Sequence, residues 1–564
     1  MKYKVRPDLP EDIKEKLKGY HPIAQKLLYH RGIDNSLDAE VFLNPSYERD
    51  IFDPSLLKDM GRAVARLLLA ISKDEKIAVY SDYDADGIPG GVILHDFFKA
   101  ISFQNFRNYI PHRHDEGYGL NMEAIDELAR DNVRLIITVD CGIADVAPAE
   151  RCKNLGIDLI ITDHHLPQEK LPDAYAILNP KQKDCQYPDK MLCGAGMAFK
   201  LVQGILQKER FGLKKGYEKW FLDMAGLSTI ADMVPLVGEN RAIAHFGLKV
   251  LRKSKRIGLK KLLRKNKIKQ ENLSEDDIGF MIAPRINAAG RMDTPEDAFR
   301  LLATTDEDEA EVLSEHLNKI NNERKGVVAS MVKEARHKEE RFVGKKVIVL
   351  GNPNWRPALL GLVANSLVES MNRPVFIWGR DGGSVIKGSC RSDGSVSVVE
   401  MMTLSEGLFL EFGGHKFAGG FSVDHEKIHT LENELEKAYE KAIRESVDEE
   451  NQADFYGSPS DININTWKEI EAFAPFGEGN PKPVFCFLNV LLNKVGTFGK
   501  ENNHLTIEFA GEDNIKRKAI KFFAKSDDFG QKLKEGERVS LVGNIEKSEF
   551  GNFSEIRLRI VDIF

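Results

Sequence analysis

The chain has 564 residues, of which 42% are hydrophobic and 30% are charged, and its formal net charge is −7. This length predicts roughly three or four domains. The mildly acidic total excludes a uniformly basic coat protein for nucleic acid, although a local basic groove would be enough to bind a strand. No run of about 18 apolar residues occurs, so no transmembrane helix is predicted.

The start of the chain and its cysteines indicate the compartment. The first 20 residues contain no apolar segment of the kind found in secretory signals. The six cysteines form no CxxC pair, which argues against a zinc site and against a disulfide framework. We therefore expect a cytoplasmic protein that does not associate with membranes.

A βαβ rhythm follows an N-terminal helical segment over residues 1–50. Short apolar runs rich in β-branched residues alternate with helical stretches throughout residues 51–304. The runs lie at 77–82, 106–111, 134–142, 158–165 and 174–179, with helical spacing at 91–101, 122–131 and 147–156. This alternation predicts a mainly parallel sheet with helices on both faces, and such sheets bind ligands at the carboxyl ends of their strands.

The pattern changes three times after this unit. Residues 305–343 are highly charged and carry apolar residues at a spacing of three to four, which predicts a long connecting helix. Residues 344–445 form a second α/β unit, with strands expected at 347–351, 374–379 and 384–390. A polar, acidic linker is expected around 445–461. The final segment, residues 455–564, contains several short strands and predicts a small all-β barrel.

Three alternating aspartates follow the first predicted buried strand. The stretch IAVYSDYDADGI, residues 77–88, contains Asp82, Asp84 and Asp86. An EF-hand loop begins in the same way, but it needs helices on both sides and a glutamate at its twelfth position, where this chain has Ile93. The calcium-loop interpretation is therefore rejected. Three solvated aspartates in a turn are the structural alternative for the motif taken alone.

Further acidic and imidazole side chains follow other predicted elements. Asp140 ends one strand-like run, Asp163, His164 and His165 end another, and Asp232 follows a helical stretch. Carboxylates and imidazoles without a thiolate suit Mn²⁺ or Mg²⁺. So many ligands indicate two ions about 3.5–4 Å apart that share a carboxylate, an arrangement used to hydrolyse phosphate esters.

The ordered motifs resemble those of a known superfamily. DYDADG, VDCG, TDHH and IADMVPL resemble, in this order, the four motifs of the DHH phosphoesterases. PHRHDEGYGLN, PRINAAGRM, GSCRS, GGHKFAGGF and APFGEGNPKPVF further resemble segments of the RecJ single-strand-specific exonucleases, from about Gly19 to the end. The resemblance implies an α/β fold with a DHH-type parallel-sheet catalytic domain. A long helix would join it to a second α/β DHH-associated domain, and a C-terminal OB-fold would follow.

The resemblance also implies an activity and partners. The chain would use two Mn²⁺ or Mg²⁺ ions to remove nucleotides from the 5′ end of single-stranded DNA in recombination and repair. It would act as a monomer, and a helicase and a single-strand-binding protein are the implied protein partners. A narrow entrance between the two α/β domains would admit single strands only.

The resemblance assigns residues to roles. The implied metal ligands are Asp82, Asp84, Asp86, Asp140, His164 and Asp232, with Asp140 as the bridge. The implied catalytic groups are Asp140, His164, His165 and His415, and the implied DNA contacts are Arg113, Arg291, Ser389, Arg391 and His415. His165 would bind metal or orient the scissile phosphate, unless it is a buried, hydrogen-bonded histidine. Asp232 could instead cap a helix, His415 could lie on a glycine-rich surface turn, and any single arginine could be a solvated charge.

Two further features leave alternatives open. Residues 249–269 are strongly basic, so they form either a guide for the DNA backbone or a helix with one packed face. Phe487, Phe498 and Phe522 are candidates to stack on bases in the barrel, but a core role is favoured for most of them.

Two places depart from the family pattern and bear on rival functions. Arg356 and Ala358 stand where RecJ proteins usually have histidine and glycine, and Pro89 stands where a small hydroxyl residue is usual. These departures put details of substrate binding in doubt. The rivals are a DHH enzyme for short oligonucleotides, cyclic dinucleotides or pyrophosphate, a nuclease for 3′ ends or RNA, and a non-catalytic replication scaffold. The C-terminal barrel argues against the first, and the complete ligand set argues against the last.

Overall fold

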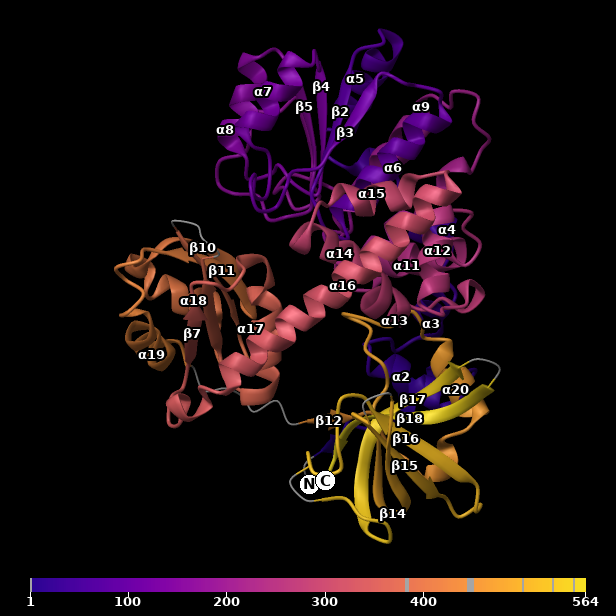
Figure 1. Ribbon diagram of the computed structural model, residues 1–564. Coiled ribbons are helices and arrows are strands. Elements are labelled where there is room, and N and C mark those ends of the chain that lie inside the picture. The colour runs from indigo at the N-terminus through magenta and orange to yellow at the C-terminus, as the bar shows by residue number, and fades with distance from the viewer. Residues whose placement is uncertain (1–2, 381–384, 444–450, 500–501, 530–531, 551–552) are drawn as a thin grey trace.

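The computed structural model describes residues 3–380, 385–443, 451–499, 502–529, 532–550 and 553–564. Its architecture confirms the predicted fold class: a parallel-sheet unit, a long helix, a second α/β unit and a C-terminal barrel (Figure 1). Among the described residues, none of the helices is long and apolar enough to cross a bilayer. Residues 445–450 of the expected acidic linker lie outside the described residues, whereas its remainder, 451–461, contains short strand segments and a 3-10 helix (Pro459–Asp461).

The first unit is built on a five-stranded sheet whose strands are all parallel, in the order β3-β2-β4-β5-β6. Its strands are β2 (Ile77–Ser81), β3 (Phe106–Tyr109), β4 (Leu135–Val139), β5 (Asp158–Thr162) and β6 (Ala176–Leu178). Every residue of β2 and β4 is buried, as expected for central strands covered on both faces. The carboxyl ends of β2, β4 and β5 therefore meet at one edge of the sheet.

Helices cover both faces of this sheet, and further helices of the same unit lie between it and the long helix (Figure 1). They are α5 (Met60–Ser72), α6 (Gly87–Ala100), α7 (Met122–Arg130), α8 (Val146–Asn154), α9 (Gly194–Lys208), α10 (Leu222–Ala231), α11 (Gly238–Leu251), α12 (Ile257–Lys265), α13 (Glu275–Asp277), α14 (Ala283–Met292) and α15 (Glu296–Ala303). A short π-helix (Ile278–Ile282) leads into α14. One large apolar core joins the sheet to most of these helices.

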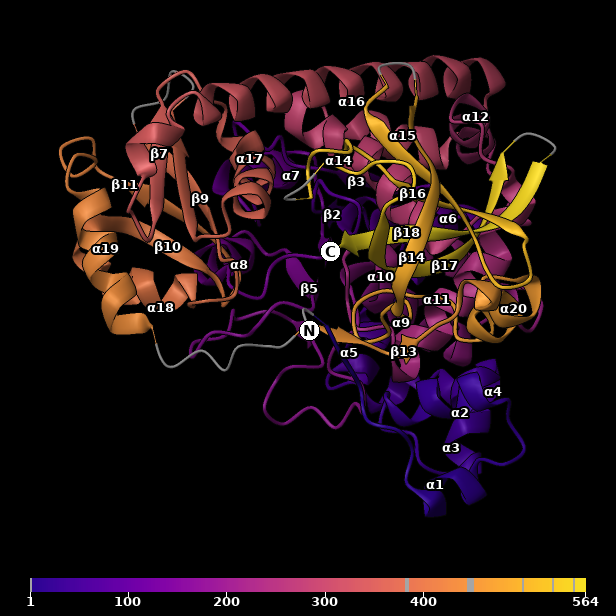
Figure 2. The same cartoon turned by 90° about the horizontal axis from the view of Figure 1, so that it is seen from below.

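The connecting helix α16 (Glu307–Arg336) is a single helix of 30 residues. Asp306 caps its start by accepting a hydrogen bond from the Glu309 N–H, and acidic residues fill its first turn. Its first half packs on the first unit and its second half packs on the second unit, as Figure 2 shows. The long helix α16 therefore connects the two α/β units and sets the distance between them.

The second unit has a mixed sheet in the order β10-β11-β9-β8-β7. Its strands are β7 (Ile348–Asn352), β8 (Val375–Gly379), β9 (Ile386–Arg391), β10 (Phe409–His415) and β11 (Ala418–Val423), and its helices are α17 (Pro357–Met371), α18 (Val398–Thr403) and α19 (Leu431–Ala442). Only β7 and β8 pair in parallel, while the other neighbours pair antiparallel. The hairpin of β10 and β11 forms one margin of this sheet.

The C-terminal unit is a closed barrel, because β14 pairs with both β15 and β17. The strands are β13 (Phe455–Tyr456), β14 (Phe485–Phe498), β15 (His504–Ala510), β16 (Lys516–Lys521), β17 (Arg538–Phe550) and β18 (Phe553–Ile563), with helix α20 (Ile464–Glu471) beside them. The N-terminal helices α1 (Glu11–Lys16), α2 (Pro22–Tyr29), α3 (Ser36–Leu43) and α4 (Tyr47–Asp50) precede the first unit in sequence. Leu17, Leu27 and Leu28 share an apolar core with the barrel. Parallel pairing of β1 (Lys4–Val5) with β12 (Gln452–Ala453) also joins the start of the chain to the segment that precedes the barrel.

Candidate functional site

The three alternating aspartates lie in a tight turn between β2 and α6. The Asp82 N–H donates to the carbonyl of Val139 at 3.1 Å, which holds the turn beside β4. The Asp84 carboxylate accepts hydrogen bonds from the N–H groups of Asp86 at 2.8 Å and Gly87 at 3.2 Å. A Cβ on Gly87 would lie 2.5 Å from the Asp82 carbonyl oxygen, so only glycine fits there. The turn thereby gathers three carboxylates at the carboxyl end of β2.

The next two strands add Asp140 and the paired histidines. Asp140 follows β4 with φ of 63°, a left-handed backbone that is uncommon outside glycine. The Asp163 carboxylate accepts from the N–H groups of His164 at 2.7 Å, His165 at 3.0 Å and Ile143 at 2.9 Å, and lies 2.8 Å from His165 Nδ1. Asp163 therefore organises this loop rather than facing an open ligand position.

Helices α9 and α10 complete the cluster from the other side. The Asp86 carboxylate accepts the N–H groups of Gly194 at 2.6 Å and Ala195 at 2.7 Å, at the start of α9. Asp232 follows the last residue of α10 as its C-terminal cap residue. His164 Nε2 lies 3.6 Å from Asp86 Oδ2, 3.7 Å from Asp232 Oδ2 and 3.1 Å from Asp140 Oδ1. His164 is thus central to the cluster.

Three overlapping sets of groups in the described residues could hold metal ions. They are Asp82 with Asp84 and Asp140, Asp86 with His164 and Asp232, and Asp140 with His164 and His165, and within each set the ligand atoms lie within 4.8 Å of one another. Asp140 and His164 each belong to two sets. Shared ligands of this kind suit a pair of neighbouring ions.

Burial and mutual repulsion dominate the electrostatics of the cluster. Burial raises the pKa of Asp140 well above its usual range, and the charges of Asp86, Asp84 and Asp82 raise it further. Burial and the charges of Asp86 and Asp84 raise the pKa of Asp232 to about 9. Burial also lowers the pKa of His164 to about 3, which keeps its imidazole neutral. A divalent cation binds ionised carboxylates and a neutral imidazole, so its charge would offset the burial and repulsion that raise these carboxyl pKa values.

The arrangement of oxygen atoms also fits a cation. Within the described residues, the buried Oδ1 atoms of Asp82 and Asp140 accept no hydrogen bond. His164 Nε2 is 3.1 Å from Asp140 Oδ1, but the pair lacks the alignment of a hydrogen bond. Buried oxygens without donors are costly unless a ligand satisfies them. The donor set therefore fits Mn²⁺ or Mg²⁺.

Sequence reasoning missed three residues that shape this centre. Asn287 Oδ1 accepts the Ala85 N–H at 2.9 Å and so fixes the aspartate turn from α14. The Tyr118 hydroxyl donates to the carbonyl of Asp140 at 2.9 Å and lies 3.1 Å from His165 Nδ1. Gly194 packs so closely that an added Cβ would lie 2.4 Å from the Cβ of Asp140. Both Asn287 and Tyr118 lie in segments that resemble RecJ, which was the available signal.

Two of the predicted DNA contacts lie beside the metal centre. The Arg113 guanidinium lies over the Tyr83 ring, 4.7 Å from its centroid, and its charge acts on Asp82. Burial lowers the pKa of Arg291 to about 10, and the charges of Arg113 and Asp84 act on it as well. Arg291 donates to the carbonyl of Ala358 at 2.6 Å and so links α14 to α17.

The other predicted DNA contacts belong to the second unit. Arg391 Nη1 donates to Ser389 Oγ at 3.1 Å on β9. His415 is exposed at the tip of the hairpin, one residue pair beyond Gly414 and Gly419. In the described part of the chain, no hydrogen bond or ion pair joins these three side chains to the metal-centre residues. The structure brings Ser389 and Arg391 together and leaves His415 apart from the cluster.

Two of the three departing residues, Pro89 and Ala358, have structural accounts. Pro89 is the third residue of α6, where a backbone N–H would have no helical partner, so proline costs little. Ala358 supplies the carbonyl that Arg291 binds, a contact that any residue could make at this position. Neither residue alters the metal-centre side chains.

The basic stretch 249–269 behaves mainly as a packed helix. Leu259, Leu262 and Leu263 of α12 are buried. On its charged side, Lys261 binds Glu307 at 2.7 Å and Lys265 binds Glu311 at 2.7 Å on α16. Part of the charge of this helix is therefore paired within the protein.

In the barrel, Phe487 is fully buried, so it is a core residue rather than a stacking residue. Phe498 and Phe522 pack against His504 with ring centroids 5.1 Å away in both cases. Phe523 projects into solvent, with 82% of its surface exposed.

Comparisons with known proteins match all three units. Residues 76–230 match the DHH family, N-terminal domain, residues 344–445 match the DHHA1 domain, and residues 453–562 match the RecJ OB domain. The single-stranded-DNA-specific exonuclease RecJ of Bacillus subtilis is 35% identical over 563 residues, which cover 99% of this chain and 70% of that protein. The protein of the same name from Escherichia coli is 30% identical over 82% of this chain and 83% of its own length. The crystal structure of RecJ in complex with Mn²⁺ from Thermus thermophilus superposes with a TM-score of 0.81 at 28% identity, covering 100% of this chain and 79% of that one.

Proposed function

Because the chain belongs to the RecJ family of single-stranded-DNA-specific exonucleases, we propose that it removes nucleotides from the 5′ end of single-stranded DNA. The observation that carries the proposal is the metal centre, in which Asp140 and His164 each belong to two of the three ligand sets. Mn²⁺-containing and Mg²⁺-containing structures of RecJ from Thermus thermophilus are similar to this chain. We infer that two such ions bind here, with Asp82, Asp84, Asp86, Asp140, His164 and Asp232 as ligands.

The protein residues supply positioning and charge. When bound, a pair of divalent ions supplies an activated water and neutralises charge at the scissile phosphate. Asp140 bridges the ligand sets, and the Asp163 carboxylate and the Tyr118 hydroxyl hold His165 towards the centre. His165 either completes the ligand set or orients the phosphate.

The proposed DNA contacts are Arg113, Arg291, Ser389, Arg391 and His415. Arginine forms paired hydrogen bonds with phosphate oxygens, and the fixed geometry of Ser389 beside Arg391 suits one phosphate group. Arg113 and Arg291 carry positive charge to the edge of the carboxylate cluster, where a phosphodiester must approach. His415 is proposed to contact the substrate when the hairpin meets the strand.

The remaining proposals concern organisation and partners. We propose domain limits at residues 1–50, 51–304, 305–343, 344–445 and 455–564, a monomeric state and a cytoplasmic location. A helicase and a single-strand-binding protein are the proposed protein partners. An enzyme limited to single strands needs other proteins to expose those strands and to deliver them.

A polarity assay tests the function. The protein is incubated with Mn²⁺ and a single strand labelled at its 3′ end, beside a matching duplex, the Asp140→Asn variant and the control Asp173→Asn. Asp173 is exposed and pairs with Lys153, away from the centre. We expect a ladder of shortened labelled products with wild type and with the control, but not with Asp140→Asn or the duplex. Immediate release of the labelled nucleotide would establish 3′-end attack, and cleavage of dinucleotides alone would establish a short-substrate enzyme.

A further inference from the structure

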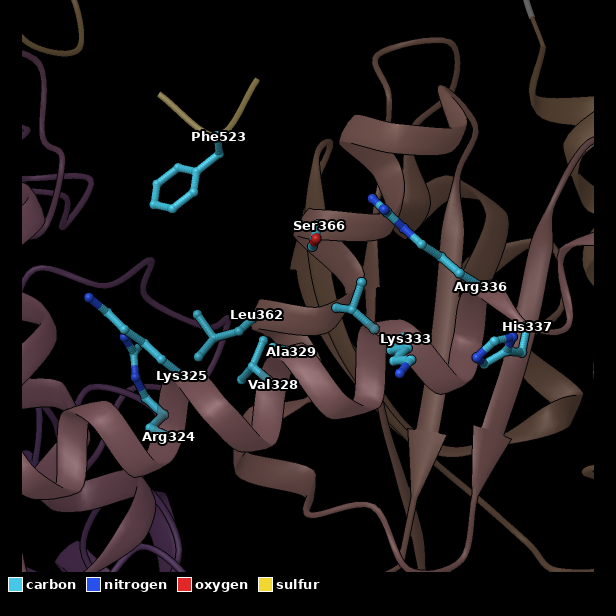
Figure 3. Close-up of a pocket in the computed structure, with 11 residues that line it drawn as sticks. Arg324, Lys325, Val328, Ala329, Lys333, Arg336, His337, Leu362, Ser366 and Phe523 are labelled. Atoms are coloured by element: carbon cyan, nitrogen blue, oxygen red, sulfur yellow. The ribbon is translucent and has the colours of Figure 1, made fainter. Parts of the chain in front are cut away.

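A groove with a volume of about 800 Å³ lies outside the metal centre, between the long helix and the barrel. Figure 3 shows α16 along its floor, with Leu362 and Ser366 from α17 beside it and Phe523 from the barrel across the opening. Five basic residues line it: Arg324, Lys325, Lys333, Arg336 and His337. Among the described residues, its lining contains apolar side chains but no aspartate or glutamate. The groove is therefore basic and partly apolar.

At the end of the groove nearest α14, positive charges gather without carboxylate partners. Arg285 donates to Asn318 and to the carbonyl of Met281, which are neutral groups. Burial lowers the pKa of Lys325, and the charges of Arg285 and Arg324 lower it further. Across the described residues, no ion pair joins any of these three side chains to a carboxylate. A cluster of cations of this kind is destabilising until an anion binds.

Two unpartnered polar groups on α16 lie with this cluster. Asn321 is fully buried, and neither its amide nitrogen nor its oxygen finds a hydrogen-bond partner within the described chain. The Nε of Arg324, three residues later on the same helix face, is also buried without a partner. Buried polar groups are nearly always satisfied, so these atoms indicate a polar ligand or the water that accompanies one.

Phe523 offers a rigid aromatic surface on the opposite side of the groove. Its backbone N–H donates to His504 Nδ1 at 3.0 Å, and its ring meets the His504 ring edge-on with centroids 4.9 Å apart. The ring is nevertheless 82% exposed, at a backbone φ of 52°. An aromatic ring that is held in place and exposed is suited to stack on a nucleic-acid base.

Positively charged side chains extend from the groove to the metal centre. The charge of Arg324 acts on Arg291, which in turn lies within the influence of Arg113 and Asp84. Positive groups therefore continue from the nuclease centre along α14 to α16. A phosphate backbone that leaves the centre would meet basic groups along this line.

Resting on the proposed nuclease function, we propose that this groove binds the uncut part of the single strand, with Arg324 and Lys325 contacting phosphates and Phe523 stacking on a base. The alternation of cations with apolar and aromatic surface matches a strand, which presents phosphates and base faces together. An acidic protein segment would use the cations but has no need of an exposed, rigid aromatic ring. The occupant is therefore DNA.

The test compares binding of a long and a short ligand. Fluorescence anisotropy is measured for the full chain in EDTA, which prevents cleavage, with a single strand of about 20 nucleotides and with a dinucleotide that reaches the metal centre alone. The variants are Lys325→Gln, Arg324→Gln/Lys325→Gln and Phe523→Ala. The matched control is Lys319→Gln, on the same helix but 73% exposed and near Glu323.

We expect the double variant and Phe523→Ala each to weaken binding of the long strand about tenfold or more, and neither to change dinucleotide binding. The double variant should also reduce the slope of log Kd against log salt by about one to two. Wild-type affinity and salt slope in all variants would overturn the proposal. Poly-glutamate serves as a third ligand, and variants that lose poly-glutamate binding more than DNA binding would also overturn the proposal and would assign the groove to an acidic protein. Because binding is measured without cleavage, failure of the proposed function would show separately, as wild-type protein that binds the strand in EDTA but does not shorten it in the polarity assay with Mn²⁺.

Discussion

Gly194 provides a sharp test of how tightly the metal centre is packed. A Cβ at this position would lie 2.4 Å from the Cβ of Asp140 and 2.8 Å from its Oδ1, whereas ordinary contacts begin near 3.4 Å. Gly194→Ala therefore requires a movement of about 1 Å by Asp140 or by α9. Asp140 already has φ of 63°, and the Gly194 N–H binds Asp86, so either movement disturbs a proposed ligand.

We expect Gly194→Ala to lower kcat about 100-fold, because a displacement of about 1 Å in a reacting group has roughly this effect. Overpacking should also reduce the free energy of unfolding by about 1–3 kcal/mol. Gly196→Ala is the matched control, since it lies two residues later on α9 and its Cβ would meet nothing closer than Cys193 Sγ at 3.5 Å. Alanine favours helix by up to about 1 kcal/mol over glycine, so the control should be neutral or stabilising.

The assay is steady-state cleavage of a 3′-labelled single strand over a range of Mn²⁺ concentrations, with urea denaturation to follow folding. A folded Gly194→Ala protein with raised Mn²⁺ demand and normal Gly196→Ala behaviour would agree with the packing argument. Wild-type turnover in Gly194→Ala at low Mn²⁺ would refute it, because the structure leaves no room for that methyl group without moving Asp140.

Three further predictions address the charges of the first unit. Asp140→Asn should raise the melting temperature of metal-free protein, because it removes a buried carboxyl whose charged form is disfavoured by burial and by the charges of Asp86, Asp84 and Asp82. The same change should abolish the stabilisation by Mn²⁺, which is about 2.7 kcal/mol at 100 times Kd in a normal site, and thermal melts with and without Mn²⁺ check both effects. Lys200 and Glu239 form a fully buried ion pair, and the Tyr187 hydroxyl and the Phe52 backbone bind the same groups. Lys200→Met should therefore reduce the free energy of unfolding, measured by urea denaturation, by about 3–5 kcal/mol, and Lys200→Met/Glu239→Gln should reduce it distinctly less. Equal losses in the two variants would contradict the pairing. Burial lowers the pKa of His95 to about 4, so the unfolded chain takes up a proton before the folded chain does as pH falls below about 6.5. The free energy of unfolding should therefore decline towards pH 4, by less than about 1.4 kcal/mol per pH unit because His95 is partly exposed. His95→Gln should flatten this slope, and an unchanged slope would refute the assignment.

The metal centre could be predicted from sequence because parallel strands impose its geometry. Asp82, Asp140 and His164 each follow the end of a strand, and β2, β4 and β5 are neighbours with parallel register. Residues at those ends must meet whatever the details of the surrounding loops. Asp232 follows a helix instead, so its place depended on the resemblance alone.

The residues that sequence reasoning missed act through single distant atoms. Asn287 reaches the turn at Ala85 across about two hundred positions of chain, and nothing in its immediate sequence neighbours marks that contact. Gly194 matters because it has no side chain, since an added Cβ would collide with Asp140. The sharing of one core by Leu27 and the barrel is likewise a contact between the two ends of the sequence, which local periodicity does not carry.

The same long-range contacts explain how the groove keeps its shape. Its floor belongs to α16 and its opposite wall, Phe523, belongs to the barrel, so the distance between them depends on how these units are joined. Arg241 of α11 donates to the carbonyls of Phe42 and Phe473, each at 2.9 Å, and its guanidinium lies 3.9 Å from the Phe42 ring centroid. The first unit, the N-terminal helices and the chain entering the barrel thus meet at one buried arginine. Because α16 also packs on the first unit, both walls of the groove are fixed to the same body, and the width that a strand encounters is set by the fold rather than by a flexible connection.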